Sequence, residues 1–282
     1  MSHDSIYVHG TSGREQERLR MMNEVINPPA LRRIDVRPGD RVAEFASGLG
    51  QMSRAFARAA GANGLVVGVE RSAAQRDAAI AMLAETAAAD PGRAPIDLRL
   101  GDALAPPFAE GEWGSFDIAH TRFLLEHLPS PCDLVRVMVR AVRPGGRVIL
   151  QDEDHEILRL WPEIPGFMAV WNAYIESYER AGNDPRVGRK LVALLHEAGA
   201  RPSRSDWVFF GGCSGEPRFA PLVENLARVL EGAAEATAAT GKVSAAQVID
   251  AAAAARVWGR RPGAALWFAL AWVEGIRSSE TD

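Results

Sequence analysis

The chain has 282 residues, of which 47% are hydrophobic and 24% are charged, and its formal net charge is -4. These values are typical of globular proteins and exclude a disordered or fibrous chain. The length suits one α/β core with additional helices. A nucleic-acid partner is disfavoured, because such a partner requires a basic face that displaces counterions. The longest apolar stretch, residues 264–273, is too short to cross a bilayer, so no membrane-spanning segment is predicted.

The cysteine content and the N-terminus indicate a reducing compartment. Cys132 and Cys213 lie far apart in the sequence and outside any CxxC or Cys/His pattern. Neither a disulfide framework nor a zinc site is therefore predicted. Residues 1–20 are polar and have no signal-peptide core. We expect a soluble cytoplasmic protein without a metal site; its oligomeric state stays open, and a homodimer is one of the alternatives.

The first predicted element is a helix. Leu19, Met22 and Ile26 recur at three- and four-residue spacing, which predicts a helix over residues 15–26. Asn27-Pro28-Pro29 should end it, because proline cannot continue a helix and restricts the residue before it.

Short apolar strands alternate with helical runs from Arg41 to Asp152, which is typical of βαβ units and a mostly parallel sheet. The predicted strands are Arg41–Ala46, Leu65–Val69, Ile96–Leu100, Phe116–His120 and Arg147–Gln151, and the predicted helices are Gln51–Ala60, Ala73–Ala88 and Cys132–Val142.

The pattern is less regular after Asp152. Five rings, at Trp161, Phe167, Trp171, Tyr174 and Tyr178, have spacing that suggests one helix face, which favours core packing over an aromatic ligand pocket. Further predicted elements are a helix over Gly188–Ala198, strands over Ser205–Phe210 and Leu266–Val273, and helices over Phe219–Glu231 and Ser244–Trp258. The fold class is therefore α/β, with a doubly wound, seven-stranded and mostly parallel sheet.

Three polar or glycine-rich segments follow neighbouring strands of this sheet. Glu44-Phe45-Ala46-Ser47-Gly48-Leu49-Gly50 ends the first strand and precedes a helix, where small residues and free amides suit a carboxylate. Glu70 ends the second strand, about 20 residues further on, where a carboxylate can accept hydrogen bonds from both hydroxyl groups of a ribose. Gly101-Asp102-Ala103 follows the third strand and can receive an adenine amino group. Ligands of open α/β sheets bind at these strand ends.

A nucleotide phosphate fits this turn poorly. The turn has no GxxxxGK[ST] motif, and Ser53 occupies the position of the third glycine in the dinucleotide fingerprint. A ligand with one carboxylate and one adenosine fits better. S-adenosylmethionine (SAM) has both groups.

The sequence resembles the class I SAM-dependent methyltransferases, particularly their bacterial small-molecule group. The resemblance is good from Tyr7 to Asp152 and extends to Asn183–Arg189 and Glu197-Ala198-Gly199. The family's acidic-x-Gly-x-Gly-x-Gly turn corresponds to Glu44, Ala46, Gly48 and Gly50. The resemblance implies the Rossmann-like methyltransferase fold, SAM as cofactor and transfer of a methyl group to a small molecule, as in secondary metabolism.

The same resemblance implies roles for single residues. It gives the ribose contact to Glu70, the adenine side to Asp102 with Ala103, and an N-terminal cover to Tyr7 and the Glu15-Arg18-Leu19 segment. Arg71 and Arg122 complete the expected cofactor site. Arg122 would contact the SAM carboxylate or an acidic substrate, and the alternative is a surface salt bridge with Glu126. Ala46 departs from the family's glycine, and we expect the turn to persist if φ is negative there, whereas a positive φ would weaken cofactor binding.

The resemblance also implies one domain over residues 1–282, with a cover over 1–34 and acceptor-side insertions over 155–187 and 216–262. His155, just past the fifth strand, is the candidate general base, and Asp152 or Asp154 would orient it. A solvated acidic loop is the alternative interpretation of this segment. Metal binding is not predicted, because adjacent acids in an extended segment point in alternating directions. His120 could line the site or be hydrogen-bonded in its wall.

Three other functions compete with methyl transfer. A nicotinamide-dependent oxidoreductase would have a third turn glycine, where this chain has Ser53, or a Tyr-x-x-x-Lys pair. That pair is missing, because Tyr174 is followed four residues later by Tyr178, and Tyr178 by Gly182. A SAM-binding protein without methyl transfer, such as a regulator or a repurposed cyclase, stays open because the turn indicates binding alone. A nucleic-acid methyltransferase is disfavoured, because Thr121-Arg122-Phe123 stands where its amino-methylating members carry Asn/Asp-Pro-Pro-aromatic.

Overall fold

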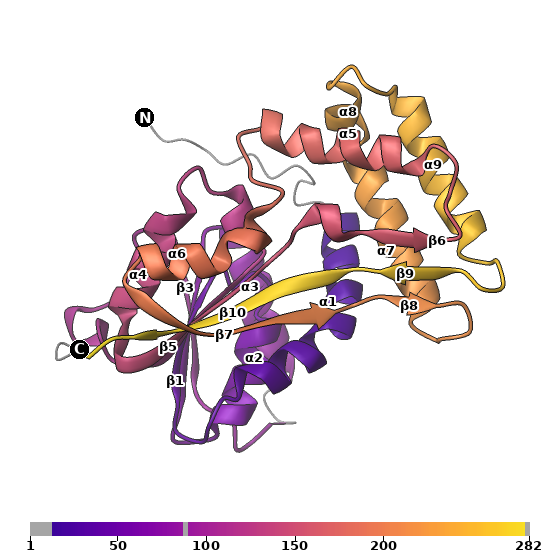
Figure 1. Ribbon diagram of the computed structural model, residues 1–282. Helices are drawn as coiled ribbons and strands as arrows, with labels where there is room; N and C mark the ends of the chain where they lie inside the picture. Colours follow the sequence, from indigo (N-terminus) through magenta and orange to yellow (C-terminus); the bar gives the residue numbers. More distant parts are fainter. Residues whose placement is uncertain (1–12, 87–89, 280–282) are drawn as a thin grey trace.

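The centre of the molecule is a seven-stranded sheet in the order β3-β2-β1-β4-β5-β10-β7 (Figure 1). The computed structural model describes residues 13–86 and 90–279, and within its first helix the side chains of 13–21, Glu24 and Val25 are left undescribed. In this sheet β10 runs antiparallel to both of its neighbours, and the other pairings are parallel. The doubly wound, mostly parallel sheet is thereby confirmed. The described strands are β1 (Arg41–Phe45), β2 (Leu65–Glu70), β3 (Ile96–Leu100), β4 (Phe116–Arg122), β5 (Val142–Asp152), β6 (Arg159–Trp161), β7 (Ala200–Phe209), β8 (Gly212–Cys213), β9 (Ala265–Trp267) and β10 (Ala269–Arg277).

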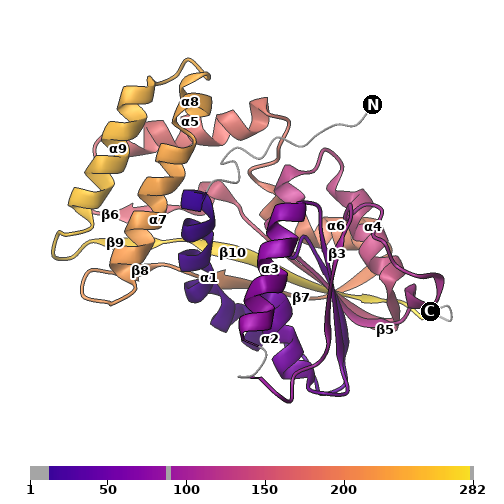
Figure 2. The same ribbon diagram turned by 180° about the vertical axis from the view of Figure 1, so that it is seen from behind.

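Helices cover both faces of the sheet, as Figure 2 shows from the side of α1, α2 and α3. Neighbouring strand residues point to opposite faces, so Val42 packs in the core with α1 and α2, whereas Ala43 packs with α4 and α6. The described helices are α1 (Gly13–Ile34), α2 (Gln51–Ala60), α3 (Ala73–Glu85), α4 (Pro131–Ala141), α5 (Phe167–Arg180), α6 (Leu191–Glu197), α7 (Phe219–Gly232), α8 (Ala234–Ala238) and α9 (Ala245–Trp258), with short 3-10 turns η2 (Glu110–Glu112), η3 (Leu125–His127), η4 (His155–Ile157) and η5 (Val187–Lys190).

The predicted end of the first helix is wrong. Helix α1 continues through Pro28 and Pro29 to Ile34. Its apolar residues Ile26 and Ile34 are fully buried in the core, so packing favours continuation of the helix. The prolines cost two intrahelical hydrogen bonds, and tertiary contacts offset that loss.

The last predicted strand also differs. Residues 266–273 were expected as one strand, but they divide between β9 and β10, and β10 continues to Arg277. Strand β9 belongs to a separate three-stranded sheet with β6 and β8, whereas β10 inserts between β5 and β7. A local apolar pattern gives no information on which sheet a strand joins.

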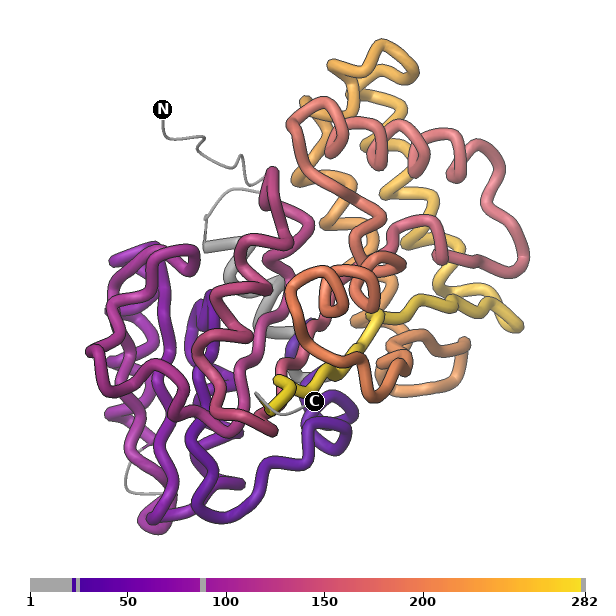
Figure 3. Tube along the Cα trace, turned by 60° about the vertical axis from the view of Figure 1, so that its left-hand side comes forward, coloured from indigo at the N-terminus to yellow at the C-terminus, as the bar shows by residue number. Residues whose placement is uncertain are grey.

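Helices α5, α7, α8 and α9 gather at one end of the molecule, beyond the end of β5 and the start of β10 (Figure 3). Helix α7 packs against α9 and α1, and α5 packs against α8 and α9. Phe167, Trp171, Tyr174 and Tyr178 are buried in α5, as their spacing predicts, but Trp161 lies in β6 and is 64% exposed. None of the described helices is both long and apolar enough to span a membrane.

Candidate functional site

A cavity of about 340 Å³ lies at the ends of β1, β2, β3 and β4. Eight of the residues expected at the cofactor site line it: Glu44, Ala46, Gly48, Glu70, Arg71, Asp102, Ala103 and Arg122. We call this the cofactor-side cavity. The parallel pairing of neighbouring strands is what brings these distant segments together, because it aligns their carboxyl ends.

The turn after β1 depends on left-handed backbone. Gly48 and Gly50 have φ values of 53° and 69°, which glycine adopts without a steric penalty. Gly50 lies behind the cavity wall rather than in it, and a Cβ there would meet Ala79 at 3.4 Å. Ala46 has φ 59°, which is the case for which weaker cofactor binding is expected. The turn forms nonetheless, at a cost of roughly 1–2 kcal/mol for a non-glycine residue.

Two acids of the cavity hold backbone amides in place. Glu70 accepts hydrogen bonds from Gly48 N at 2.9 Å and from Ser72 N at 2.8 Å, one on each carboxylate oxygen. Asp102 accepts from Leu104 N at 2.9 Å. Each carboxylate oxygen has a second lone pair, so these bonds leave capacity for ligand hydroxyl or amino groups.

Buried opposite charges lie at the ends of β1 and β4. Burial raises the pKa of Glu44 to about 7, although Ser53 Oγ donates a hydrogen bond to its carboxylate. Burial also lowers the pKa of Arg122 to about 10, and the field of Glu44 partly opposes that shift. Arg122 does not pair with Glu126; its Nη2 donates to Asn23 Oδ1 at 2.7 Å and Asn27 Oδ1 at 2.8 Å, on α1.

Three buried polar atoms near this cavity have no hydrogen-bond partner in the described part of the chain: Arg122 Nη1, Ser47 Oγ and Gln51 Oε1. All three side chains line the cofactor-side cavity. An unpaired buried polar group costs roughly 1–3 kcal/mol. This set therefore fits a polar ligand that supplies the missing donors and acceptors.

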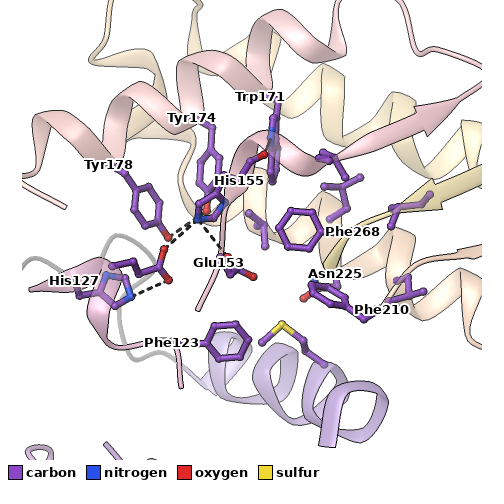
Figure 4. Close-up of a pocket in the computed structure, with 17 residues that line it drawn as sticks. Phe123, His127, Glu153, His155, Trp171, Tyr174, Tyr178, Phe210, Asn225 and Phe268 are labelled. Atoms are coloured by element: carbon purple, nitrogen blue, oxygen red, sulfur yellow. Dashed lines mark hydrogen bonds and ion pairs between the residues drawn. The ribbon is translucent and has the colours of Figure 1, made fainter. Parts of the chain in front are cut away.

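A second, mostly apolar cavity of about 70 Å³ lies beside the first, between α5, α7 and the strand ends (Figure 4). We call it the acceptor-side cavity. Its apolar and aromatic walls come from α5, α7 and the segments near β9, and a polar group of Glu126, His127, Glu153 and His155 lines it. Apolar walls with a few convergent polar groups are typical of small-molecule sites.

His155 is buried rather than part of a solvated loop. It is 2% exposed and stands against the rings of Trp171, Tyr174 and Tyr178. Its Nε2 lies 3.1 Å from Glu126 Oε2 and 3.2 Å from Glu153 Oε2. Burial lowers the pKa of His155, which favours the neutral imidazole.

The expected orienting acids have other partners. Asp152 accepts from the amides of Leu125 and Glu126, at 2.8 and 3.4 Å, and Asp154 pairs with Arg189 at 2.6 Å. Glu126 and Glu153 are the carboxylates beside His155. Their ligand-type atoms and that of His155 lie within 4.8 Å of one another, a spacing that a metal ion could also use.

His120 lies in the wall and lines neither cavity. Its Nε2 is 3.0 Å from Gln151 Nε2, the residue is fully buried, and burial holds its pKa well below the ordinary value. Of the two positions that the sequence left open for His120, the structure therefore shows the one in the wall.

Sequence reasoning missed Asn23 and Gln51, which line the cofactor-side cavity. Phe123 and His127 line both cavities and belong to the segment 122–128, which resembles the family's loop along the methionine part of SAM. Gln51 directly follows the predicted turn, which was a usable signal. Asn23 had none, because only the packing of α1 against the sheet brings it to Arg122. Tyr7 lies outside the described residues.

Comparison with known proteins gives the same class repeatedly. A family model described as a methyltransferase domain matches residues 43–150. A demethylmenaquinone methyltransferase from Desulfitobacterium hafniense (strain Y51) is 26% identical over 238 residues, covering 80% of this chain and 89% of that protein. A 2-phytyl-1,4-naphtoquinone methyltransferase from Synechococcus elongatus is 32% identical over 116 residues, but these cover only 41% and 47% of the two chains. The solved structure of geranyl diphosphate methyltransferase in complex with SAM has a TM-score of 0.52 at 16% identity, covering 96% and 94%.

Replacement of Ala46 by glycine should stabilise the protein. Glycine removes the left-handed strain, which is worth roughly 1–2 kcal/mol. It also raises the conformational entropy of the unfolded chain, which offsets roughly 0.4–1 kcal/mol of that gain. We expect the free energy of unfolding, measured by urea denaturation, to rise by about 0.5–1 kcal/mol. Ala81→Gly, on the exposed face of α3, is the matched control and should lower it by about 1 kcal/mol. A loss of stability in both variants would contradict the assigned strain.

Proposed function

The chain belongs to the class I SAM-dependent methyltransferases and methylates a small-molecule acceptor, and we propose that the cofactor-side cavity binds SAM and the acceptor-side cavity binds a largely apolar acceptor. When bound, SAM supplies a methyl group on a positively charged sulfur. The single observation that carries the cofactor placement is the set of unpartnered buried atoms on Arg122, Ser47 and Gln51 beside the buried Glu44.

The two ends of the cavity suit the two ends of SAM. Arg122 Nη1 would donate to the amino-acid carboxylate, and the ionised Glu44 would accept from its ammonium group. Glu70 would accept from the ribose hydroxyls, and Asp102, with Ala103, would lie on the adenine side. Arg71 and the turn from Ala46 to Gly48 complete the wall.

The acceptor-side cavity supports an uncharged, ring-shaped acceptor. Its apolar wall includes Trp171, Phe210 and Phe268, whereas its polar atoms concentrate around His155 (Figure 4). We infer that residues 155–187 and 216–262 are the acceptor-side insertions, because α5 and α7 contribute to this wall. The related quinone methyltransferases from Desulfitobacterium and Synechococcus make a naphthoquinol ring the first acceptor to test.

His155 is the proposed general base. A neutral imidazole can take the proton that the acceptor loses, and Glu126 or Glu153 can stabilise the imidazolium that forms. The acceptor atom forms its bond to the methyl carbon as the carbon–sulfur bond breaks, and the bonding electron pair stays on sulfur. The proton goes to His155, which balances the step.

Three finer points belong to the same proposal. The acceptor belongs to secondary metabolism and is not a nucleic acid, in keeping with the net charge of -4. The protein acts in the cytoplasm. Residues 1–34 form the cover of the cofactor site, which is supported by the contacts of Asn23 and Asn27 with Arg122.

Calorimetric titration with S-adenosylhomocysteine (SAH), the product left after methyl transfer, tests the cofactor assignment. We expect micromolar affinity for SAH and none for NAD. Glu70→Ala should weaken SAH binding at least about tenfold, because ribose contacts and the Gly48 amide both lose their acceptor. Glu110→Ala, at an exposed position, is the control. Wild-type binding of NAD in preference to SAH would overturn the proposal, and SAH binding without any methyl transfer would favour the non-catalytic alternative.

The affinity for SAH should depend on pH through Glu44. Because the pKa of Glu44 is raised to about 7, its carboxylate is mostly protonated at pH 6 and mostly ionised at pH 8. SAH binding, which needs the ionised form, should therefore tighten by about tenfold over this interval. Glu44→Gln should bind weakly with no such pH dependence, whereas Glu110→Gln should behave as wild type. An unchanged pH profile in Glu44→Gln would remove this role.

His155→Asn should lower the turnover of 1,4-naphthoquinol by at least about 100-fold, because a general base contributes roughly 10²–10⁴ in rate. SAH formation measures the reaction. The affinity for SAH should stay near that of wild type, and His196→Asn, on the exposed face of α6, should retain full turnover. Because the proposed base needs no metal, turnover should persist in EDTA. Full turnover by His155→Asn at the same pH would show that another group takes the proton.

A further inference from the structure

The transferred methyl group must cross between the two cavities, and among the described residues Phe123 and His127 line both of them. Figure 4 shows Phe123 across the acceptor-side cavity from the rings of Trp171 and Tyr174. The sulfur that carries the methyl group must therefore lie close to this pair. This inference rests on the proposed function and adds a role to Phe123.

The backbone of Phe123 is held in a conformation that bulky residues rarely adopt. Its φ is 56°, and its N–H donates to Gln151 O at 3.1 Å. Successive residues of a strand point to opposite faces, but the left-handed turn at Phe123 lets both Arg122 and Phe123 line the cofactor-side cavity. A strained residue at a cavity boundary is retained only where the surrounding structure fixes it, and such residues concentrate at functional sites.

The electrostatic surroundings of Phe123 suit a cation. The Arg122 guanidinium carbon lies 5.4 Å from the centre of the Phe123 ring, within cation–π range, and the ligand carboxylate assigned to Arg122 would offset its repulsion of a second cation. The other boundary residue adds no repulsion, because burial lowers the pKa of His127 to about 4 and its imidazole is neutral at pH 7.

We propose that the ring of Phe123 forms the wall beside the positively charged sulfur and makes the protein prefer SAM over SAH. The sulfonium of SAM is attracted by the ring, and the neutral thioether of SAH is not. The contact also fixes the methyl carbon at the opening toward the acceptor. Loss of the charge on transfer weakens the contact and favours release of SAH.

Calorimetry of three variants with SAM and SAH tests this preference without any knowledge of the acceptor. Phe123→Leu keeps an apolar side chain and the left-handed residue but removes the ring. It should weaken SAM binding by about tenfold and SAH binding by less than about threefold, as expected for loss of a desolvated cation–π contact. Phe123→Tyr keeps the ring and should keep the wild-type ratio of the two affinities.

Phe123→Gly separates the ring from the backbone strain. Glycine adopts the left-handed region freely, so a loss of affinity in this variant cannot come from backbone strain, and the variant should still lose the preference for SAM. The role of the ring would be overturned if the ratio of the SAM and SAH affinities stayed at its wild-type value in Phe123→Leu and Phe123→Gly, whether or not both affinities weaken. Failure of the wild type to bind SAH would instead overturn the cofactor assignment itself, so the two failures are distinguishable.

Discussion

The site depends on the parallel register of β1 between β2 and β4. This register sets Glu44 opposite Gly68 on one side and His120 on the other, so the strand ends carry Glu44, Glu70 and Arg122 to the same edge. Glu44 and Glu70 are buried and Arg122 is partly buried, and desolvation shifts the pKa values of Glu44 and Arg122 toward their neutral forms because a charge alone is costly in an apolar interior. The mutual field of Glu44 and Arg122 and the contacts of α1 with Arg122 make this pair tolerable, and the proposed zwitterionic ligand end would add an opposite charge to each.

The two cavities differ in electrostatic character in the way that methyl transfer requires. Charged groups gather on the cofactor side, where a ligand with fixed charges must be held. The acceptor side is walled mostly by rings and aliphatic side chains, with a neutral His155 between Glu126 and Glu153. Methyl transfer needs chiefly a well-aligned approach of two atoms, so positioning by rigid walls supplies much of the rate. In the proposed mechanism, one buried imidazole takes the proton.

Backbone strain is concentrated at the same place. Ala46 and Phe123, two of the three non-glycine residues with positive φ in the described chain, lie on the cofactor-side cavity. Ala46 stands in the turn after β1, and Phe123 stands at the boundary with the acceptor-side cavity. The sheet fixes both, because Ser47 N donates to Val69 O and Phe123 N to Gln151 O. The strands thereby oppose relaxation of residues that would otherwise prefer a negative φ.

The sequence alone determined the order of strands and helices over Arg41–Asp152 and the cluster of Glu44, Glu70 and Asp102, because periodicity and turn residues are local properties and parallel strands align their ends. It could not determine where α1 ends, since burial of Ile26 and Ile34 outweighs the two prolines. It could not place β10 between β5 and β7, nor bring Asn23 to Arg122 and Glu126 to His155. These pairings join residues far apart in the chain. Only the packing of whole elements decides them, because no local pattern records which distant surface a side chain will meet.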